Sequence, residues 1–197
     1  MADSKINIAI ISGSLRKGSF NTSLIRFVAN DLASNGDVHI DEISLAELDL
    51  PMFSEDLEAE GTPASVIELK DRMIAADAIL IGSPEYNGSI SGALKNAIDW
   101  ASRPREGEAP LACFKGKVGG LFAASPGAIG GLRGLRHVRQ ILTQLHMVVV
   151  PAEFALGVAH DAFDEDGQMK SDRSATMAKG VGLAVTQMTS ALKNSES

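Results

Sequence analysis

Five short apolar runs, each followed by a stretch with helical spacing, most strongly constrain the fold of this 197-residue chain. Four of the runs are largely apolar throughout, and the second alternates between apolar and polar residues. The runs predict strands at Ile6–Ser12, Val38–Ile43, Ala78–Ile81, Lys117–Ala124 and Met147–Val150. A strand that is apolar throughout buries both of its faces, which is typical of a parallel sheet. The order therefore predicts an α/β fold, a doubly wound five-stranded parallel sheet with helices on both faces.

Capping and helix-breaking residues mark the ends of the predicted helices. The first helix begins at Asn21 and stops at Asn35-Gly36, because glycine tolerates the left-handed conformation found at helix ends. The later helices open at Pro63 and after Ser91, span Leu132–Leu145, and end near Leu192. The acidic connection Leu45–Gly61 is expected to run over the surface. Because no repeat, linker or low-complexity segment divides the chain, residues 1–197 are expected to form one domain.

Composition and charge exclude several classes of partner. The net charge of −7, with both signs mixed along the chain, gives no electrostatic footprint for nucleic acid or an anionic membrane. No stretch approaches the roughly 20 apolar residues of a spanning helix, and residues 1–13 hold no signal-peptide run. Cys113 is the single cysteine, so neither an internal disulfide nor a zinc site is expected. A cytoplasmic protein without a metal site fits these features best.

The loops after the first, third and fourth strands are the expected place for a ligand. In open parallel sheets, ligands bind beyond the carboxyl ends of the strands, near the point where the strand order switches. The three loops are Gly13–Asn21, Ser83–Ser91 and Ser125–Gly131, and all are rich in glycine, serine and other small polar residues. Their convergence at one edge is more informative than any one of them.

The first loop, GSLRKGSFN, joins a strand to a helix and could cradle a single phosphate. Its amides, the hydroxyls of Ser14 and Ser19, the Asn21 amide and the Arg16 guanidinium are suitable donors. The residues after Gly18 exclude a P-loop, and the glycine spacing excludes the dinucleotide fingerprint. An ordinary glycine-serine turn with a helix cap remains the alternative.

The other two loops could hold a flat ligand. In SPEYNGSISG, backbone groups could meet the polar edge of a planar heterocycle, and Tyr86 could pack against it. The glycines of SPGAIGG would let backbone amides approach closely, because they add no side-chain bulk. An ordinary turn and a flexible connection are the respective alternatives.

Taken together, GSLRKGSFN at 13–21, SPEYNGSISGALKNAIDWASR at 83–103 and SPGAIGG at 125–131 resemble the NADPH-dependent FMN reductase family. That flavodoxin-like family includes chromate, quinone and azo-dye reductases. The resemblance implies non-covalent FMN, with Ser14, Arg16, Ser19, Phe20 and Asn21 on its phosphate and ribityl side, Pro84, Glu85, Tyr86, Asn87 and Gly88 on its ring side, and Ser125 and Gly127 closing another side.

The resemblance also implies the reaction and the assembly. NADPH or NADH would deliver hydride to the flavin N5 atom, and a small acceptor would then be reduced in a ping-pong cycle without a catalytic side chain. Quinones, flavins, azo dyes, chromate and ferric complexes are the expected acceptors, and a homodimer or homotetramer is the expected assembly. A flavodoxin-type electron carrier and a flavin redox sensor remain alternatives.

One basic helix, GLRGLRHVRQILTQL, keeps three interpretations open. Its cations are Arg133, Arg136 and Arg139. They could form a solvated face, pair with acidic groups across an oligomer contact, or attract the 2′-phosphate of NADPH together with Arg103 or Arg105.

Overall fold

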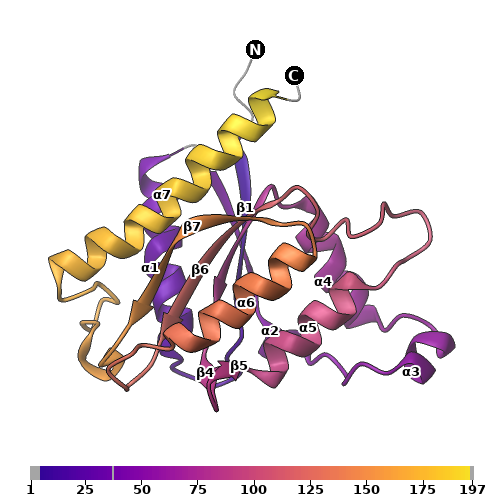
Figure 1. Cartoon of the computed structure of the whole chain (residues 1–197), viewed down its shortest axis with the longest axis horizontal. Helices are drawn as coiled ribbons and strands as arrows, with labels where there is room; N and C mark the ends of the chain where they lie inside the picture. Colours follow the sequence, from indigo (N-terminus) through magenta and orange to yellow (C-terminus); the bar gives the residue numbers. More distant parts are fainter. Residues whose placement is uncertain (1–4, 37, 196–197) are drawn as a thin grey trace.

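The computed structural model describes residues 5–36 and 38–195, and it contains the predicted parallel sheet. The strands are β1 (Ile6–Ser12), β2 (Val38–Ile43), β3 (Ala78–Gly82), β6 (Val118–Ala124) and β7 (Val148–Leu156). They pair in the order β2-β1-β3-β6-β7, all parallel, which is the flavodoxin-like order of a doubly wound fold. The predicted fold class is thereby confirmed. Figure 1 shows the strands fanning across the molecule between two layers of helices.

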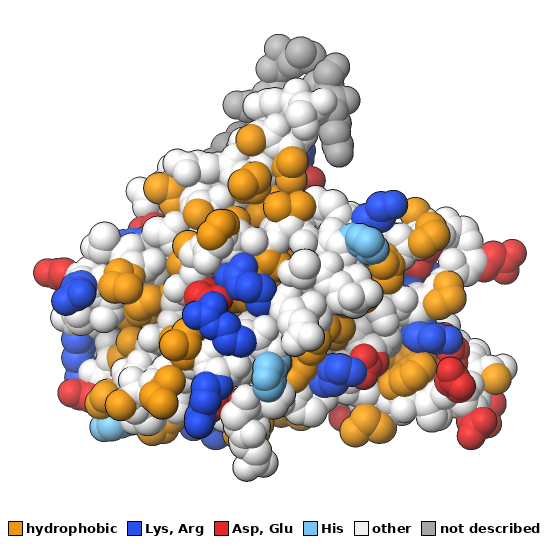
Figure 2. All heavy atoms as spheres, viewed as in Figure 1, with side chains coloured by type: hydrophobic (Ala, Val, Ile, Leu, Met, Phe, Trp, Pro, Cys, Tyr) orange, Lys and Arg blue, Asp and Glu red, His pale blue; other side chains and the backbone are white. Residues whose placement is uncertain are grey.

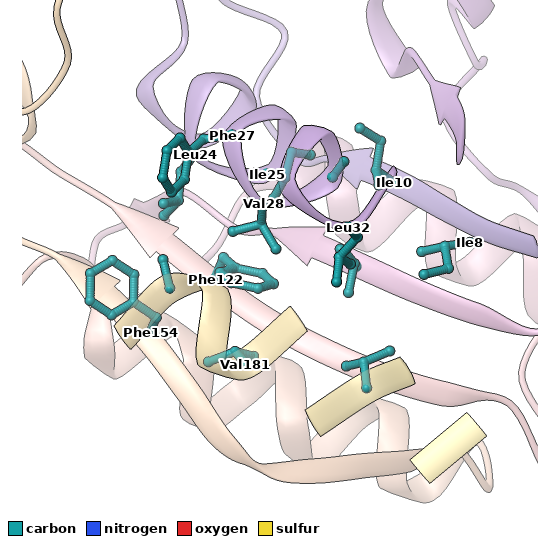
Figure 3. Close-up of a cluster of buried hydrophobic side chains, with 14 of the residues drawn as sticks. Ile8, Ile10, Leu24, Ile25, Phe27, Val28, Leu32, Phe122, Phe154 and Val181 are labelled. Carbon is teal, nitrogen blue, oxygen red and sulfur yellow. The ribbon is translucent and has the colours of Figure 1, made fainter. Parts of the chain in front are cut away.

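Helices cover both faces of the sheet, as the apolar strands require. Their bounds are α1 (Phe20–Asn35), α4 (Ala64–Ala75), α5 (Gly92–Ser102), α6 (Leu132–Gln144) and α7 (Asp172–Ser195). Along β1, Ile8 and Ile10 belong to the core under α1 and α7 (Figure 3), whereas Ala9 and Ile11 belong to the core under α4, α5 and α6. This alternation explains why the central strands are apolar at nearly every position.

The fifth strand is longer than predicted. We expected it to end at Val150, but β7 continues through Pro151 to Leu156. The pairing with β6 shifts between Gly119 and Leu121, where Val149 and Glu153 are the successive partners. Proline is tolerated there because β7 is an edge strand and the irregularity removes the need for a ladder hydrogen bond. The sequence signal for a strand break was therefore misleading at Pro151.

The acidic connection contains two short helices, α2 (Leu45–Leu48) and α3 (Glu55–Glu60). Serine starts each one: Ser44 Oγ accepts from the Glu47 N–H at 3.3 Å, and Ser54 Oγ accepts from the Leu57 N–H at 3.1 Å. Leu45 and Leu48 are buried, whereas α3 buries no residue. Only the second half of the connection is thus a surface excursion.

Two further elements lie outside the main sheet and its helices. A short 3-10 helix, η1 (Ala159–Asp161), follows β7, and the strands β4 (Glu85–Tyr86) and β5 (Ser89–Ile90) form a separate hairpin. The hairpin projects at the lower edge of Figure 1, where the strands of the main sheet end. Within residues 5–36 and 38–195, no helix has the length and apolar character needed to span a membrane.

Candidate functional site

Close packing joins the first and third loops at the carboxyl edge of the sheet. Ser91 Oγ donates a hydrogen bond to the Gly13 carbonyl at 2.6 Å and accepts one from the Leu94 N–H at 3.1 Å, so the predicted cap of α5 also holds the first loop. A Cβ on Gly13 would lie 2.8 Å from Leu94 Cβ and 3.2 Å from Pro84 Cδ. Only glycine allows this approach without a shift of its neighbours.

Asn21 joins the first loop to the end of β6. Its side-chain Nδ2 donates to the Ala124 carbonyl, and its Oδ1 accepts from the Ala124 N–H, both at 2.9 Å. The side chain is buried and acts as a short strand partner for β6. Its amide is therefore engaged with the backbone directly before Ser125. Asn21 consequently fixes the relative position of the two loops, and a direct contact with a phosphate remains a prediction.

The first loop presents unpaired donors at the start of α1. Ser19 caps the helix, since its Oγ accepts from the Thr22 N–H at 3.3 Å. The N–H groups of Phe20 and Asn21, in the first turn, have no intrahelical partner and carry the positive end of the helix dipole. The Arg16 guanidinium lies 4.9 Å from the centre of the Phe20 ring. Gly18 has a φ of +68°, which glycine adopts without strain.

A cavity of about 340 Å³ lies against this loop. The candidate residues Ser14, Arg16 and Ser19 line it, and Lys17 adds a further cation. Hydroxyls, two cations and the helix start suit a phosphate group. The same cavity extends toward the end of β2 and the start of α2, a side that our sequence interpretation left out. The strand order explains this extension, because the end of β2 lies next to the end of β1, where the first loop begins.

The third loop is a hairpin rather than a simple turn. Glu85 pairs with Ile90 and Tyr86 with Ser89, and Asn87 and Gly88 between them both have positive φ, 52° and 79°. Two central residues with positive φ are typical of a type I′ turn, which matches the right-handed twist of the flanking strands. Asn-Gly is the strongest short-range signal for such a hairpin, so the sequence contained this information. Tyr86, 55% exposed, is available to a ligand at the edge.

Glu85 points toward α6. Its Oε1 accepts from Arg133 Nε at 2.8 Å, and its Oε2 accepts from the Gly134 N–H at 3.1 Å, in the first turn of α6. Burial of this carboxyl, 8% exposed, opposes ionisation, but the hydrogen bonds from Arg133 and Gly134 outweigh it and hold the pKa of Glu85 below its ordinary value. The side chain therefore anchors the hairpin, and only the backbone of Glu85 is left for a ligand.

Glu85→Gln is expected to lower the free energy of unfolding by about 1 kcal/mol at pH 7, because a charge-assisted pair is replaced by neutral hydrogen bonds. A lowered folded-state pKa stabilises the protein above the ordinary value of about 4.5, and the contribution is lost as the pH falls through the folded-state pKa. Urea unfolding of both proteins at several pH values measures the difference. A difference that stays constant below pH 4.5 would contradict this assignment.

The fourth-strand loop packs on the segment after β7. A Cβ on Gly130 (φ +69°) would lie 2.7 Å from the Gly157 backbone nitrogen, and one on Gly157 would lie 2.4 Å from the Ala128 oxygen. These glycines therefore permit close packing between two backbone segments. The sequence predicts that the loop glycines let a ligand approach the backbone, and at Gly130 the structure shows this packing role instead. Gly127 is exposed, and its N–H donates to Ser125 Oγ at 3.2 Å. Ser125 and Gly127 thus remain at the open edge beside the hairpin.

The basic helix pairs with acidic groups of its own chain. Arg136 and Arg139 bind the Glu153 carboxylate, at 3.2 and 2.9 Å, while Arg133 binds Glu85. Figure 2 shows blue side chains over α6 with red atoms between two of them. The other two candidates are also paired, Arg103 with Glu58 at 2.8 Å and Arg105 with Asp71 and Glu108. A 2′-phosphate would have to compete with these carboxylates.

The candidate site thus combines a first loop whose groups suit a phosphate with an open edge formed by the hairpin and the fourth-strand loop. Asn21, Ser91 and Glu85 hold these loops in fixed relation through contacts of 2.6–3.1 Å. An elongated ligand with a phosphate at one end and a planar group at the other fits this arrangement. Among the described residues, no group of three or more His, Cys, Asp or Glu side chains could hold a metal ion.

Comparison with known proteins agrees with this geometry. Residues 6–161 match the family model described as NADPH-dependent FMN reductase. The chain is 37% identical to the NAD(P)H-dependent FMN reductase PA1204 of Pseudomonas aeruginosa, over 86% of this chain and 87% of that protein. It is 40% identical to a quinone reductase of Escherichia coli K12, over 81% of this chain and 82% of that protein.

Solved structures extend the similarity to the fold. The flavoenzyme NAD(P)H:(acceptor) oxidoreductase FerB of Paracoccus denitrificans superimposes with a TM-score of 0.81 and 32% identity, covering 93% of this chain and 97% of that one. An archaeal flavodoxin gives a TM-score of 0.59 at 16% identity, which shows the fold alone.

Proposed function

Because this chain belongs to the NADPH-dependent FMN reductase family, we propose that its three loops hold FMN at the carboxyl edge of the sheet. The chain is an FMN-dependent NAD(P)H oxidoreductase of the α/β flavodoxin-like class. The observation that carries the proposed site is the contact of all three loops around one edge. We further propose that residues 1–197 form one FMN-binding domain.

The residues at the edge suit FMN chemically. Ser14, Arg16, Ser19 and the N–H groups of Phe20 and Asn21 would hold the phosphate and the ribityl chain. The backbone of Pro84, Glu85, Asn87 and Gly88 and the ring of Tyr86 would lie along the isoalloxazine, with Ser125 and Gly127 on another side. Two positive-φ residues at the hairpin tip, Asn87 and Gly88, expose backbone groups for this purpose.

The protein contributes binding and orientation to the reaction. FMN supplies the hydride and electron transfer when it is bound. The start of α1 and Arg16 would fix the phosphate, and the hairpin, held by Glu85, would fix the ring, so that the nicotinamide and the acceptor meet one oriented face in turn. The Glu85 carboxylate is committed to Arg133 and Gly134, which leaves it no role as a proton donor at neutral pH.

The substrate and the assembly belong to the same proposal. The open edge suits small acceptors, with quinones the first choice because quinone reductases are among the relatives. A ping-pong cycle follows if nicotinamide and acceptor use the same exposed ring face in succession. We also propose a homodimer or homotetramer and a cytoplasmic location.

Anaerobic addition of NADPH to the purified protein tests the function. Bleaching of the bound flavin, followed by recovery when a quinone is added, is the expected result, and NADH in a parallel sample ranks the two donors. If neither NADPH nor NADH reduces the bound flavin, the protein would instead be an electron carrier or a redox sensor. A Glu85→Gln protein that retains FMN but has no turnover would contradict a reaction without a catalytic side chain.

A further inference from the structure

The cavity at the first loop extends away from the proposed ring side. The ring-side loops follow β3 and β6, which lie on one side of β1, whereas the cavity continues toward β2 on the other side. One face of α1 and the segment from the end of β2 into α2 form this extension, which we call the β2-side groove. Its residues are Thr22, Ser23, Arg26 and the segment 42–46, of which Glu42, Ser44 and Ala46 are not buried.

The charge around the β2-side groove favours a second anionic group. Arg26 donates to both Glu42 oxygens, at 2.9 and 2.8 Å, so the one carboxylate on the lining is neutralised. Arg16 and Lys17 are then in excess, and within the described part of the chain Lys17 makes no ion pair or hydrogen bond. A phosphate that enters the groove therefore meets net positive charge.

The position of Glu42 suits a ribose. Glu42 stands at the carboxyl end of β2, beside the strand whose following loop forms the phosphate cradle. In dinucleotide-binding folds of the doubly wound class, an acidic residue after the glycine-rich turn accepts a hydrogen bond from a ribose hydroxyl. This chain lacks their glycine fingerprint, but the Glu42 carboxylate has lone pairs for the same kind of contact. Leu15, which is exposed, and Ala46 add apolar surface on which a base could rest.

We propose that the β2-side groove binds the adenylate half of FAD, so that this flavin site accepts FAD as well as FMN. This inference rests on the proposed FMN site. The adenylate of FAD is joined to the flavin phosphate, and the groove is continuous with the phosphate cradle. The cradle and the groove together measure about 340 Å³, at the small end of the range for ligand sites, about 300–1,000 Å³. The groove would therefore take the phosphate and ribose of the adenylate, and the base would rest on its open side.

The nicotinamide cofactor also contains an adenylate group, but its binding position is restricted in a different way. Its reactive ring has to reach the ring side of the edge, and no bond ties its phosphates to the first loop. The groove, which leads away from the ring side, therefore favours the flavin as the source of the adenylate.

Calorimetric titration of flavin-free protein with FMN and with FAD tests the proposal. Arg26→Gln removes the cation that neutralises Glu42, and Ala46→Trp fills the groove from its exposed side. Both are expected to raise the Kd of FAD at least about tenfold and to leave the Kd of FMN nearly unchanged. Lys95→Gln, which breaks a surface pair with Asp99 on α5, is the matched control and should change neither.

Each remaining outcome overturns the inference in a recognisable way. Wild-type protein that binds FMN but not FAD refutes it and leaves the proposed function intact, whereas binding of neither flavin refutes the proposed site itself. FAD affinity that neither variant changes removes the groove as its binding place. Variants that raise the KM for NADPH without weakening FAD would assign the groove to the nicotinamide cofactor instead.

Discussion

Lys70→Met is expected to lower the free energy of unfolding by about 3 kcal/mol, because it leaves a buried carboxylate without one of its two cationic partners. The Lys70 side chain is only 3% exposed, and its ammonium group lies 2.8 Å from Oε2 of Glu108, whose side chain is 10% exposed. It also donates to the Arg103 carbonyl, so it fastens the segment between α5 and β6 to α4. Arg105 remains 2.6 Å from Glu108 Oε1. The expected loss is therefore near the lower end of the range of about 3–5 kcal/mol for breaking a buried ion pair.

Urea unfolding of the flavin-free protein measures this loss. Lys95→Met is the matched control, because Lys95 and Asp99 form an exposed pair, 49% and 36% accessible, worth about 0.3–0.5 kcal/mol. The double variant Lys70→Met/Glu108→Leu should recover much of the lost stability, since no charge is then left buried. Equal losses for Lys70→Met and Lys95→Met would show that the buried pair has no special role.

Asn21→Asp is expected to weaken the binding of FMN and of riboflavin alike, each at least about tenfold, or about 1.4 kcal/mol. The substitution places a carboxylate oxygen against the Ala124 carbonyl, where Nδ2 now donates at 2.9 Å. The two groups repel each other in a buried position, so the first loop and the loop after β6 lose their fixed spacing. Riboflavin lacks the phosphate, and its loss of affinity would therefore report on the ring side.

Flavin fluorescence titrations of the two ligands test this role. Arg16→Gln is the control variant, because it should weaken FMN through the phosphate and leave riboflavin nearly unchanged. If Asn21→Asp spared riboflavin, then Asn21 would act on the phosphate alone and would not fix the spacing of the two loops. Asn21→Asp should in addition lower the free energy of unfolding by about 2–4 kcal/mol, because two buried hydrogen-bonding groups lose good partners.

The sequence alone determined the fold class and pointed to the edge where we propose the site. Apolar runs and helical spacing are local signals, and the rule that parallel strands share one carboxyl edge converts them into a prediction for three loops. The cap at Ser91 was also predicted correctly, because a serine before a helical pattern bonds groups only three residues away. Asn87-Gly88 was an equally local signal, which marked a turn correctly; the structure shows that two short strands pair on either side of it.

Only the tertiary structure decided which candidate side chains hold the loops together and which line the cavity or remain exposed. Asn21 and Ala124 are 103 residues apart, and Glu85 and Arg133 are 48 apart, so no local pattern could pair them. Pro151 lies within a strand because β7 is an edge strand with an irregular register, a property of the assembled sheet. The β2-side groove likewise exists because β2 lies beside β1. Short-range sequence signals fix where most elements begin and end, whereas packing between distant segments fixes the end of an edge strand such as β7 and what the side chains contact.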